Sequence, residues 1–454
     1  MFRKLLSALG LTLFVSSMLL AQSSGTLKGK LVDKETKEPI PFANIVAETG
    51  GKQMGGSTTD FDGNYTIKPI PPGTYDVKAT YVGYKPLMVQ GVVVKDGIIT
   101  FLDIEMESTA VTLTTFEVVD YKVPLIEKDG GSSGGTVTSE EIEKMAGRDA
   151  TSVAVTVGGV FKNDGSDDMN IRGGRSDGTV MYIDGVRVRG SSSLPKSALE
   201  QVTVITGGLP ANYGDATGGV VNITTKGASR TFGMGAELVT SKFLDPYNYN
   251  LLGLFMQGPL LKGKDSTNNT ALLGYFLAGE FSYEKDNYPF FDGLYKAKDD
   301  YLAQVEQYPL RETGLGYGTY QNLQFVTMDN LEKIKAKIEC PSYAANLSLK
   351  LDVRTTSTTN LTFGGSLNYS NGLAYVHSYS MFNYKQYPQV ISSTWRVFGR
   401  FTQRFNADTA SKSIVKNVFY NIQADYSKYN YLEQDPEHKD NLFKYGHWGK
   451  FNTY

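Results

Sequence analysis

Apolar and polar residues alternate over long runs in the second half of the chain. In the run that ends at Arg354, every second residue is apolar: Ala345, Leu347, Leu349, Leu351 and Val353. The residues between them are polar: Asn346, Ser348, Lys350 and Asp352. A period of two indicates a β-strand with one apolar and one polar face. Similar runs within 361–369, 395–405 and 414–426 predict further strands of about ten residues or longer, typical of an outer-membrane β-barrel.

The connections between these predicted strands alternate in length. Residues 242–249, 261–269, 355–360 and 407–413 form short connections, whereas 286–344 and 373–391 are long. We interpret 261–269, 355–360 and 407–413 as the periplasmic turns, which places the other connections outside. Outer-membrane barrels have short periplasmic turns and longer external loops. A large soluble antiparallel sandwich is the alternative, and it predicts no such alternation. We therefore expect residues 227–454 to form part of a transmembrane antiparallel β-barrel.

Shorter strand patterns fill residues 26–107. Runs such as LKGKLVD and FANIVA are separated by turn signals, including an Asp62-Gly63 turn. Strands of this length with frequent turns predict a small β-sandwich. Asp60 and Asp62 alone would suggest calcium, but the later ligands of a calcium loop are missing, so we expect a plain turn.

Residues 141–226 are compact and rich in glycine. The stretch EEIEKMAGRDATSVAVTVGGV predicts a short helix and then a strand, and PKSALEQV predicts a short helical piece. The stretch MNIRGGRSDGTVMYIDGVRV predicts two strands around a glycine-arginine turn. Further on, strand residues at 205 and 220–223 are joined by glycine-dense chain. Such a segment either packs its backbone very close to a neighbour or separates readily.

Residues 108–140 form a predicted linker between these two regions. It contains a β-prone run followed by a Gly/Ser-rich stretch, GGSSGG, which favours flexibility. We call the run at residues 114–119 the coupling segment; it consists of Thr114, Thr115, Phe116, Glu117, Val118 and Val119. An unpaired extended run beside a flexible tether can add a strand to the sheet edge of another protein. An ordinary inter-domain strand is the alternative.

The first residues have the pattern of a secretory signal. Arg3 and Lys4 precede an apolar run that ends at Leu20, and small or polar residues follow. We expect a signal peptide over residues 1–21 with cleavage after Ala21, and therefore an exported protein. A single transmembrane anchor is the alternative, although the run is short for a span of roughly 20 residues.

Composition excludes several classes of function. The net charge of −2 gives no indication of a nucleic-acid partner. One cysteine excludes internal disulfides and multi-cysteine metal sites, and only three histidines are present. We expect no catalytic residues, no metal site, no cofactor and no enzymatic activity.

Two regions resemble known families. The stretches GKLVDKETKEPIPFANIVAE and STTDFDGNYTIKPIPPGTYDVKATYVGYKP, with the closing LDIEM, resemble the carboxypeptidase regulatory-like (prealbumin-like) domain, a packing module without a catalytic role. The ordered stretches NIRGGRSDGTVMYIDGVRV and LEQVTVITGGLPANYGDATGGVVNITTKG resemble the plug domain of TonB-dependent outer-membrane receptors. Together they resemble the Bacteroidetes-type receptors that carry an N-terminal extension.

The resemblance implies a mainly β fold in three parts: a β-sandwich, a small α+β plug domain and a barrel. The plug motif residues that carry it are Arg172, Gly173, Gly174, Arg175, Asp184, Gly185, Gly207, Gly208, Tyr213, Gly214, Gly218, Gly219 and Asn222. In the family, plug arginines pair with acidic residues of the barrel wall, and this role falls here on Arg172 and Arg175. Residues 114–119 take the place of the segment that contacts the TonB protein, the TonB box.

The function implied is uptake of a scarce or large solute across the outer membrane, with the N-terminal domain and the plug on the periplasmic side. The solute classes are siderophore, oligosaccharide or peptide, and the implied partners are outer-membrane lipids and the TonB complex with ExbB and ExbD. A glycan importer paired with a surface lipoprotein is an alternative, although its usual plug signature is absent. A non-transporting surface adhesin or assembly protein is another.

The number of strands departs from the family pattern. Barrels that enclose a plug have about 22 strands, which need on the order of 200 residues at 9–11 each. Only 454 − 226 = 228 residues follow residue 226, and the long loop uses about a quarter of them. We count roughly seven or eight strands, and we expect an incomplete barrel from a truncated frame or fragment.

Overall fold

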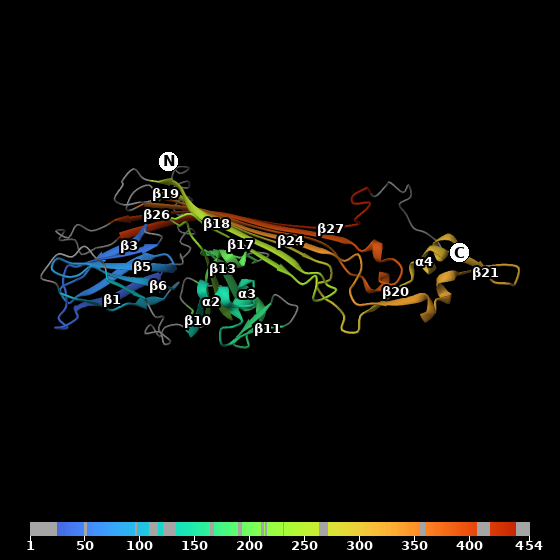
Figure 1. Ribbon diagram of the computed structural model, residues 1–454, viewed down its shortest axis with the longest axis horizontal. Coiled ribbons are helices and arrows are strands. Elements are labelled where there is room, and N and C mark those ends of the chain that lie inside the picture. Colours follow the sequence, from blue (N-terminus) through green and yellow to red (C-terminus); the bar gives the residue numbers. More distant parts are fainter. Residues whose placement is uncertain are drawn as a thin grey trace, which may run out of the picture.

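The structure is a computed structural model, and it describes most of the chain from Gly25 onward. The described residues are 25–49, 52–95, 98–108, 117–120, 133–163, 168–188, 193–209, 213, 216–229, 231–262, 271–354, 359–405 and 418–441. The predicted signal peptide, Thr114–Phe116 of the coupling segment and Gly214 lie outside them. Three bodies follow one another along the chain, and Figure 1 shows the first at one end of a long sheet and the second against one face of that sheet.

The N-terminal domain consists of two facing β-sheets. Its strands are β1 (Gly25–Asp33), β2 (Asn44–Thr49), β3 (Lys52–Thr58), β4 (Asn64–Ile70), β5 (Gly73–Thr80), β6 (Leu87–Val94), β7 (Ile99–Phe101), β8 (Ile104–Met106) and β9 (Glu117–Asp120). One sheet has the order β4-β1-β7 with β8 also on β1, and the other has the order β3-β2-β5-β6-β9. Buried and partly exposed residues alternate along β5, as a half-buried strand requires. The mainly β prediction for this region is confirmed.

The Asp60 carboxylate forms hydrogen bonds within its own turn. The Asp60 carboxylate accepts hydrogen bonds from the amides of Asp62 at 3.0 Å and Asn64 at 2.8 Å. The bond from the Asn64 amide is the main cause that lowers the pKa of Asp60 below its usual value. Among the described residues, no group of three or more metal-ligating side chains gathers anywhere.

The central domain combines short helices with a five-stranded mixed sheet. Its elements are β10 (Ser133–Thr138), α2 (Ser139–Lys144), α3 (Ala150–Ala154), β11 (Val160–Lys162), β12 (Met169–Ile171), β13 (Thr179–Ile183), β14 (Val186–Arg187), β15 (Leu199–Gly207) and β16 (Gly219–Thr225), with 3-10 turns η1 (Ser176–Gly178) and η2 (Lys196–Ala198). The sheet order is β10-β15-β16-β13-β14, with β13 and β16 parallel. The region therefore holds two short helices where one was predicted. The predicted helical piece is a single 3-10 turn, because the chain is already extended from Leu199.

Strand β16 is the best-covered element of the central domain. All seven of its residues are buried, and it lies between β15 and β13. Strand β16 itself therefore forms core, whereas Gly208 in the preceding glycine-dense stretch is exposed. At Gly219, an added Cβ would stand 2.6 Å from the Ile171 side chain and 2.9 Å from the Ile205 carbonyl oxygen. Close backbone packing explains glycine at this position.

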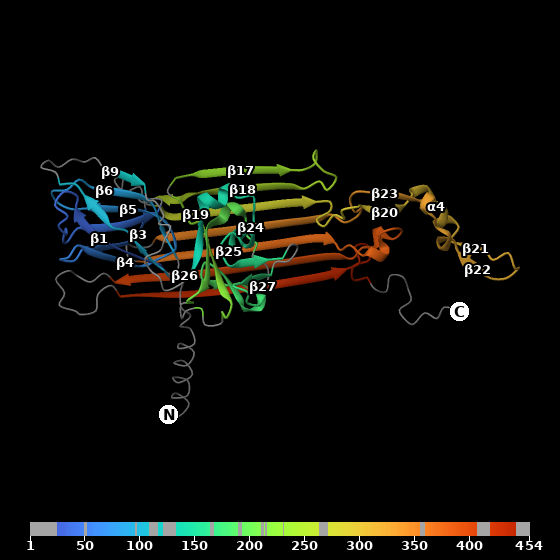
Figure 2. The same cartoon turned by 90° about the horizontal axis from the view of Figure 1, so that it is seen from below.

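The second half of the chain forms one seven-stranded antiparallel sheet, which we call the wall sheet. Its strands, in spatial order, are β17 (Gly233–Thr240), β18 (Asn250–Lys262), β19 (Ala271–Glu284), β24 (Ser342–Arg354), β25 (Thr359–Leu373), β26 (Gln389–Phe405) and β27 (Val418–Gln434). Figure 2 shows these strands side by side, with β17 and β27 at opposite edges. The long connections fall between β19 and β24 and between β25 and β26, as the alternation predicted. The predicted short connections at 261–269, 355–360 and 407–413 lie largely outside the described residues.

Rows of aligned residues give the wall sheet one apolar and one polar face. One row across all seven strands is Met234, Met256, Leu277, Leu349, Gly365, Val397 and Tyr426. The next row, on the other face, includes Ser348, Ser366, Arg396 and Ser427. Leu277 and Leu349 are exposed, while Ser348 and Arg396 are buried beneath the central domain. The large apolar side chains therefore point away from the molecule.

A folded arm, residues 285–341, connects β19 to β24 at the end of the wall sheet opposite the N-terminal domain (Figure 1). It contains β20 (Leu294–Ala297), α4 (Asp299–Gln307), β21 (Leu310–Glu312), β22 (Thr319–Gln321) and β23 (Leu331–Ile334), with 3-10 turns η3 (Asn322–Phe325) and η4 (Met328–Asn330). Two further 3-10 turns lie between β25 and β26: η5 (His377–Tyr379) and η6 (Tyr384–Gln386). At the base of the arm, the Lys337 ammonium lies 3.2 Å from the buried Asp286 carboxylate. Its nitrogen also lies 4.8 Å from the centre of the Tyr375 ring, so one lysine joins the arm to the neighbouring loop.

The single cysteine lies in this base and is expected to react slowly. Cys340 packs with Tyr384 and Tyr387, and burial raises the pKa of its thiol to about 11. A raised pKa lowers the thiolate fraction at neutral pH, and the thiolate is the nucleophile. We expect iodoacetamide to label Cys340 roughly two orders of magnitude more slowly than a free cysteine. Mass spectrometry over time, in the folded protein and in urea, measures this; equal rates in both would contradict it.

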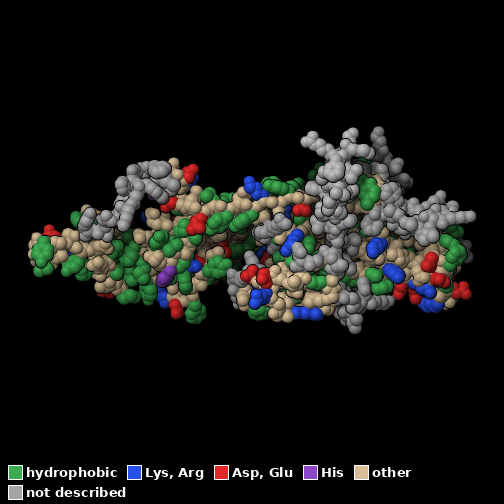
Figure 3. All heavy atoms as spheres, turned by 180° about the vertical axis from the view of Figure 1, so that it is seen from behind, with side chains coloured by type: hydrophobic (Ala, Val, Ile, Leu, Met, Phe, Trp, Pro, Cys, Tyr) green, Lys and Arg blue, Asp and Glu red, His purple; other side chains and the backbone are tan. Residues whose placement is uncertain are grey.

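On the face that Figure 3 shows, Lys, Arg, Asp and Glu side chains lie at the end formed by the N-terminal domain and near the middle of the molecule, and hydrophobic side chains are plentiful toward the other end. Within the described parts of the chain, no helix has the length and apolarity needed to span a bilayer.

Candidate functional site: the interface between the central domain and the wall sheet

Arg148 joins the central domain to two strands of the wall sheet. Its guanidinium donates to both carboxylate oxygens of Glu237 on β17, at 2.8 and 2.7 Å. One of the same nitrogens donates to Glu280 on β19 at 2.8 Å. Such forked contacts to carboxylates are among the stronger hydrogen bonds in proteins. The contact with Glu237 raises the pKa of the Arg148 guanidinium, so the cation is permanent.

Glu280 is the buried centre of this contact. It is 7% exposed and also accepts from the Lys196 amide at 3.0 Å. The Lys196 ammonium in turn donates to the Met145 carbonyl at 2.6 Å, near the end of α2. The Glu280 carboxylate thus accepts hydrogen bonds from both Arg148 and the η2 turn. Removing its cation would leave a buried charge without compensation.

Asp184 forms a second contact between the two bodies. It occupies a tight turn between β13 and β14 in which Asp184 has φ 50° and Gly185 has φ 80°. Two central residues with positive φ define a type I′ hairpin turn, for which Asp-Gly is a preferred pair. The turn directs the Asp184 carboxylate toward the Lys350 ammonium on β24, at 3.1 Å. The Asp184 carbonyl also accepts from Arg400 on β26.

Thr225 completes this second contact at the end of β16. Its hydroxyl donates to the Asp184 carboxylate at 2.5 Å, and its carbonyl accepts from Lys350 at 3.1 Å. One lysine from the wall sheet therefore bonds both the β13–β14 turn and strand β16 of the central domain. Lys350 lies on the polar face of its strand, as the alternation predicted, and both Lys350 and Arg400 contact the central domain.

The remaining described contacts are smaller. Asn368 on β25 donates to the Ser193 carbonyl at 2.5 Å, and the Ala228 amide donates to Asp352 at 3.1 Å. Ala198 packs on Phe276 in an apolar patch that spans the interface. The central domain is thus held mainly by a few charged contacts rather than by a broad apolar surface.

The two arginines predicted to pair with the barrel wall do not contact the seven described strands of the wall sheet. Arg172 has φ 50°, is exposed, and donates to the Ser133 hydroxyl at 2.6 Å within the central domain. Arg175 is also exposed, and among the described residues it makes no ion pair or hydrogen bond with the wall sheet. The contact with these seven strands is made by Arg148. A wall partner for Arg172 and Arg175 stays a prediction.

The other predicted motif residues cluster around the ends of β15 and β16. Gly207 lies against the Arg172 guanidinium, where an added Cβ would stand 2.4 Å from a nitrogen. Gly208 has φ 65°, and Gly174 donates its amide to Ile171. Tyr213 is buried with Ile205 and packs edge-on against the Tyr182 ring. The remaining members, Gly218 and Asn222, lie beside Gly178 and within β16 respectively.

The coupling segment is only partly described, and that part is paired. Glu117, Val118 and Val119 belong to β9, which runs parallel to β6 of the N-terminal domain. The interpretation of the run as unpaired is therefore wrong for these residues. The backbone of these residues pairs with the edge of a sheet in the N-terminal domain of the same chain.

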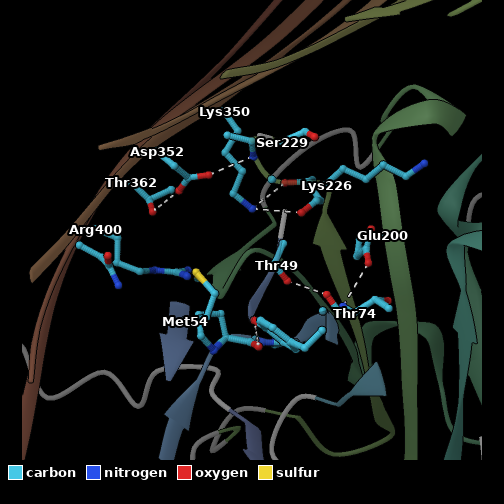
Figure 4. A pocket seen from close by; sticks show the side chains of 18 of the residues that line it. Thr49, Met54, Thr74, Glu200, Lys226, Ser229, Lys350, Asp352, Thr362 and Arg400 are labelled. Carbon is cyan, nitrogen blue, oxygen red and sulfur yellow. Dashed lines mark hydrogen bonds between the residues drawn. The ribbon is translucent and has the colours of Figure 1, made fainter. Parts of the chain in front are cut away.

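A cavity of about 440 Å³ lies where the three bodies meet. Figure 4 shows Thr49, Met54 and Thr74 of the N-terminal domain, Glu200 and Lys226 of the central domain, and Lys350, Asp352 and Arg400 of the wall sheet around it. The Thr74 amide donates to Glu200 at 3.2 Å, and the Gln201 amide group donates to the Val94 carbonyl at 3.2 Å. The N-terminal domain is thus bonded directly to β15.

Comparison with protein families matches two of the three bodies. A model of the TonB-dependent receptor plug domain matches residues 127–220, and a carboxypeptidase regulatory-like domain model matches residues 26–107. The chain carries the plug domain of TonB-dependent receptors. The central domain is this plug, so the charged contacts above are contacts between the plug and the wall sheet.

Individual relatives agree with this plug assignment. The chain is 27% identical over 240 residues to the TonB-dependent transporter Oar of Myxococcus xanthus, covering 48% of this chain and 22% of that protein. It is 29% identical over 229 residues to a TonB-dependent receptor of Formosa agariphila, covering 47% and 20%. The chain thus spans about a fifth of the length of these curated relatives.

Solved structures include a mutant of the ferric enterobactin receptor of Pseudomonas aeruginosa. The TM-score is 0.37 at 16% identity, covering 67% of this chain and 46% of that one.

Sequence reasoning missed the residues that hold the plug. Arg148, Lys196, Glu237 and Glu280 lie outside the stretches that carry the family resemblance, and their partners are distant in sequence. One signal was available: Glu237 and Glu280 are acidic residues within otherwise apolar strands. A charge in a strand that faces a lipid on one side must point to the other side.

Proposed function

We propose that this protein works as a TonB-dependent outer-membrane receptor, which takes up a scarce or large solute by energy-coupled displacement of its plug. One observation carries the proposal: the plug is fastened to the polar face of an antiparallel sheet whose opposite face is apolar along whole register rows. A soluble sandwich would bury its apolar face. Here the apolar face is exposed and the polar face is covered.

The exposed apolar rows fit contact with the lipids of the outer membrane. Leu252, Leu254 and Met256 on β18 point outward, as do Leu349 on β24 and Phe363 on β25. The N-terminal domain and the plug then lie on the periplasmic side and in the lumen. The arm at the opposite end of the strands lies outside the cell.

An arginine on this face is expected to destabilise the protein strongly. Leu349 lies in the middle of β24, so Leu349→Arg would place a charge near the centre of the bilayer. We expect a loss of about 2–4 kcal/mol, measured by unfolding the receptor in lipid vesicles. The matched control, Leu349→Met, keeps the apolar volume and is expected to cost less than about 1.5 kcal/mol. Equal stability of the two variants would contradict a lipid-facing position.

Energy coupling is proposed to act through the coupling segment. The solute binds to the external loops and the outer surface of the plug, and residues 114–119 then pair as a strand with TonB in the periplasm. The proton-motive force, delivered through ExbB and ExbD, pulls on the segment. The first plug element along the chain is β10, which pairs only with β15 in the plug sheet and buries only Val137. It is therefore the element that a pull from the N-terminal side loads first.

The force on the segment must break charged contacts between the plug and the wall sheet before the plug can move as a whole. Arg148 and Asp184 anchor two separate parts of the plug, one to β17 and β19 and the other to β24 and β26. Strand β10 belongs to neither anchor. Partial opening on the β10 side therefore leaves the Asp184 anchor in place and keeps the plug within the barrel.

The solute class remains siderophore, oligosaccharide or peptide in this proposal. Arg400 on the polar face of β26 does not argue for an anionic solute, because its guanidinium donates to the Asp184 carbonyl of the plug. A surface lipoprotein would be a further partner if the solute is a glycan. No step of the proposed cycle requires an enzyme.

Uptake in cells with and without TonB tests the proposal. The receptor as the cell expresses it should fractionate with the outer membrane, and uptake of its solute should fall to background when TonB is removed. An adhesin or assembly protein would keep its phenotype without TonB. Recovery of the protein in the soluble periplasmic fraction would also overturn the proposal.

A further inference from the structure

Strand β9 places half of the coupling segment on the N-terminal domain. Glu117–Asp120 aligns in parallel with Leu87–Gln90 at the start of β6. The sheet order β3-β2-β5-β6-β9 makes β9 the outermost strand. The residues proposed to pair with TonB are therefore already paired with a strand of their own chain.

Strand β9 is joined to the N-terminal domain by a short pairing. Among the side chains that the structure describes, the buried core cluster is drawn from residues 27–106. Val119 shares a register position with Val89, yet it is 45% exposed while Val89 is 7% exposed. The pairing spans only four residues and is parallel, which is slightly the less stable arrangement per residue. We therefore expect β9 to separate from β6 more readily than the longer antiparallel pairs of this sheet separate from each other.

Strand β6 also contacts the plug. At its far end, the Val94 carbonyl accepts from the Gln201 side chain of β15, and in the neighbouring β5 the Thr74 amide donates to Glu200. Suppose that TonB pairs with β9 while β9 stays on β6. The force from TonB would then pass through the N-terminal domain into β15, which lies in the interior of the plug sheet. If β9 leaves β6, the pull passes along the chain to Ser133 at the start of β10. Only the second path loads the weakly buried edge strand.

We propose that the N-terminal domain stores the coupling segment by pairing β9 with β6. In the exchange, TonB replaces β6 as the pairing partner of this strand. The partner is a protein with a free edge strand, which fits the backbone of residues 117–120 once β6 has released it. This inference rests on the proposed function of residues 114–119. It gives the N-terminal domain a role in that function: it lowers the fraction of receptors that can engage TonB.

A reversible crosslink between the two strands tests the exchange. Met88 and Val118 are register partners, so the pair Met88→Cys and Val118→Cys should form a disulfide under mild oxidation. The native thiol does not interfere, because Cys340 is buried in the base of the arm. We expect the oxidised receptor to bind the purified C-terminal domain of TonB roughly tenfold or more weakly than the reduced receptor. Reduction with dithiothreitol should restore binding.

A second crosslink in the same sheet is the matched control. Asn44 and Thr58 are exposed register partners on β2 and β3, at the edge away from β9. Asn44→Cys with Thr58→Cys should leave TonB binding unchanged in both redox states. Equal TonB binding by the oxidised and reduced Met88/Val118 variant would overturn the exchange, and so would failure of that disulfide to form.

A synthetic peptide of residues 112–122 separates this inference from the proposed function. If the peptide binds TonB and the oxidised receptor binds equally well, the exchange is wrong while the coupling role stands. If neither the peptide nor the reduced receptor binds TonB, the coupling role itself is wrong. Weak binding by the intact receptor and strong binding by the peptide would support storage on β6.

Discussion

Replacing Val118 by proline is expected to abolish solute uptake while leaving solute binding unchanged. Proline has no backbone N–H and fixes φ, so residue 118 could no longer take part in a strand ladder. The segment lies on the N-terminal domain, apart from the external loops where the solute would bind. Uptake of labelled solute by cells and equilibrium binding to the same cells, measured in parallel, check both halves of the expectation.

The matched control keeps the strand-forming backbone. Val118→Thr retains a β-branched side chain of similar size and should transport at close to the normal rate. Deleting residues 114–119 should reproduce the proline result. If the proline variant and the deletion both transport normally, energy is not delivered through this segment.

Removing the Arg148 side chain is expected to loosen the plug more than any other single change. Arg148→Ala leaves Glu280 buried and without its cation, although the Lys196 amide still donates to it. Breaking a buried ion pair by removing one partner costs about 3–5 kcal/mol of folding stability. Because the Lys196 amide still donates to Glu280, we expect a loss of about 3 kcal/mol. Urea unfolding of the receptor in detergent measures the loss. Entry of large antibiotics into intact cells reports the loosened plug.

Two variants separate the ion pair from a general effect of losing an arginine. Arg175→Ala removes an exposed arginine of the same domain and should change stability by less than about 0.5 kcal/mol. Arg148→Lys keeps the charge but not the forked contact with Glu237, so it should fall between the other two. If Arg148→Ala and Arg175→Ala behave alike, the contact does not hold the plug.

Local pattern was sufficient to predict the wall sheet. Strands β24 to β27 each carry a period-two signal, and the aligned rows follow once neighbouring strands pair in antiparallel fashion. Ser348 and Leu349 illustrate this, since alternation alone assigned them to opposite faces and the structure buries one and exposes the other. In the plug, strands at Ile205 and 220–223 were also predictable, but the reason for their glycines was not. Gly219 is explained by contact with Ile171, 48 residues earlier in the printed sequence.

The interface could not be predicted in the same way because its contacts join distant positions. Arg148 meets Glu237 and Glu280 across separations of 89 and 132 residues, and Lys350 meets Asp184 across 166. The family resemblance singled out Asp184 and Gly185 but gave no partner for them. It also assigned wall contacts to Arg172 and Arg175, neither of which contacts the seven described strands, and Arg172 donates to Ser133 within its own domain. Pairing of β9 with β6 likewise depends on a sheet edge that forms only after the N-terminal domain has folded.

The base of the arm has a practical consequence for labelling the protein on living cells. The contact between Lys337 and Asp286 closes the arm where it leaves β19 and enters β24, so the hairpin of β21 and β22 is joined to the wall sheet through this contact. An epitope tag that replaces residues 313–318 at the tip would alter neither this contact nor any strand of the wall sheet. With the arm outside the cell, as we propose, antibody staining of unpermeabilised cells would count receptors at the surface, and the Leu349 and Arg148 variants could be compared at equal copy number.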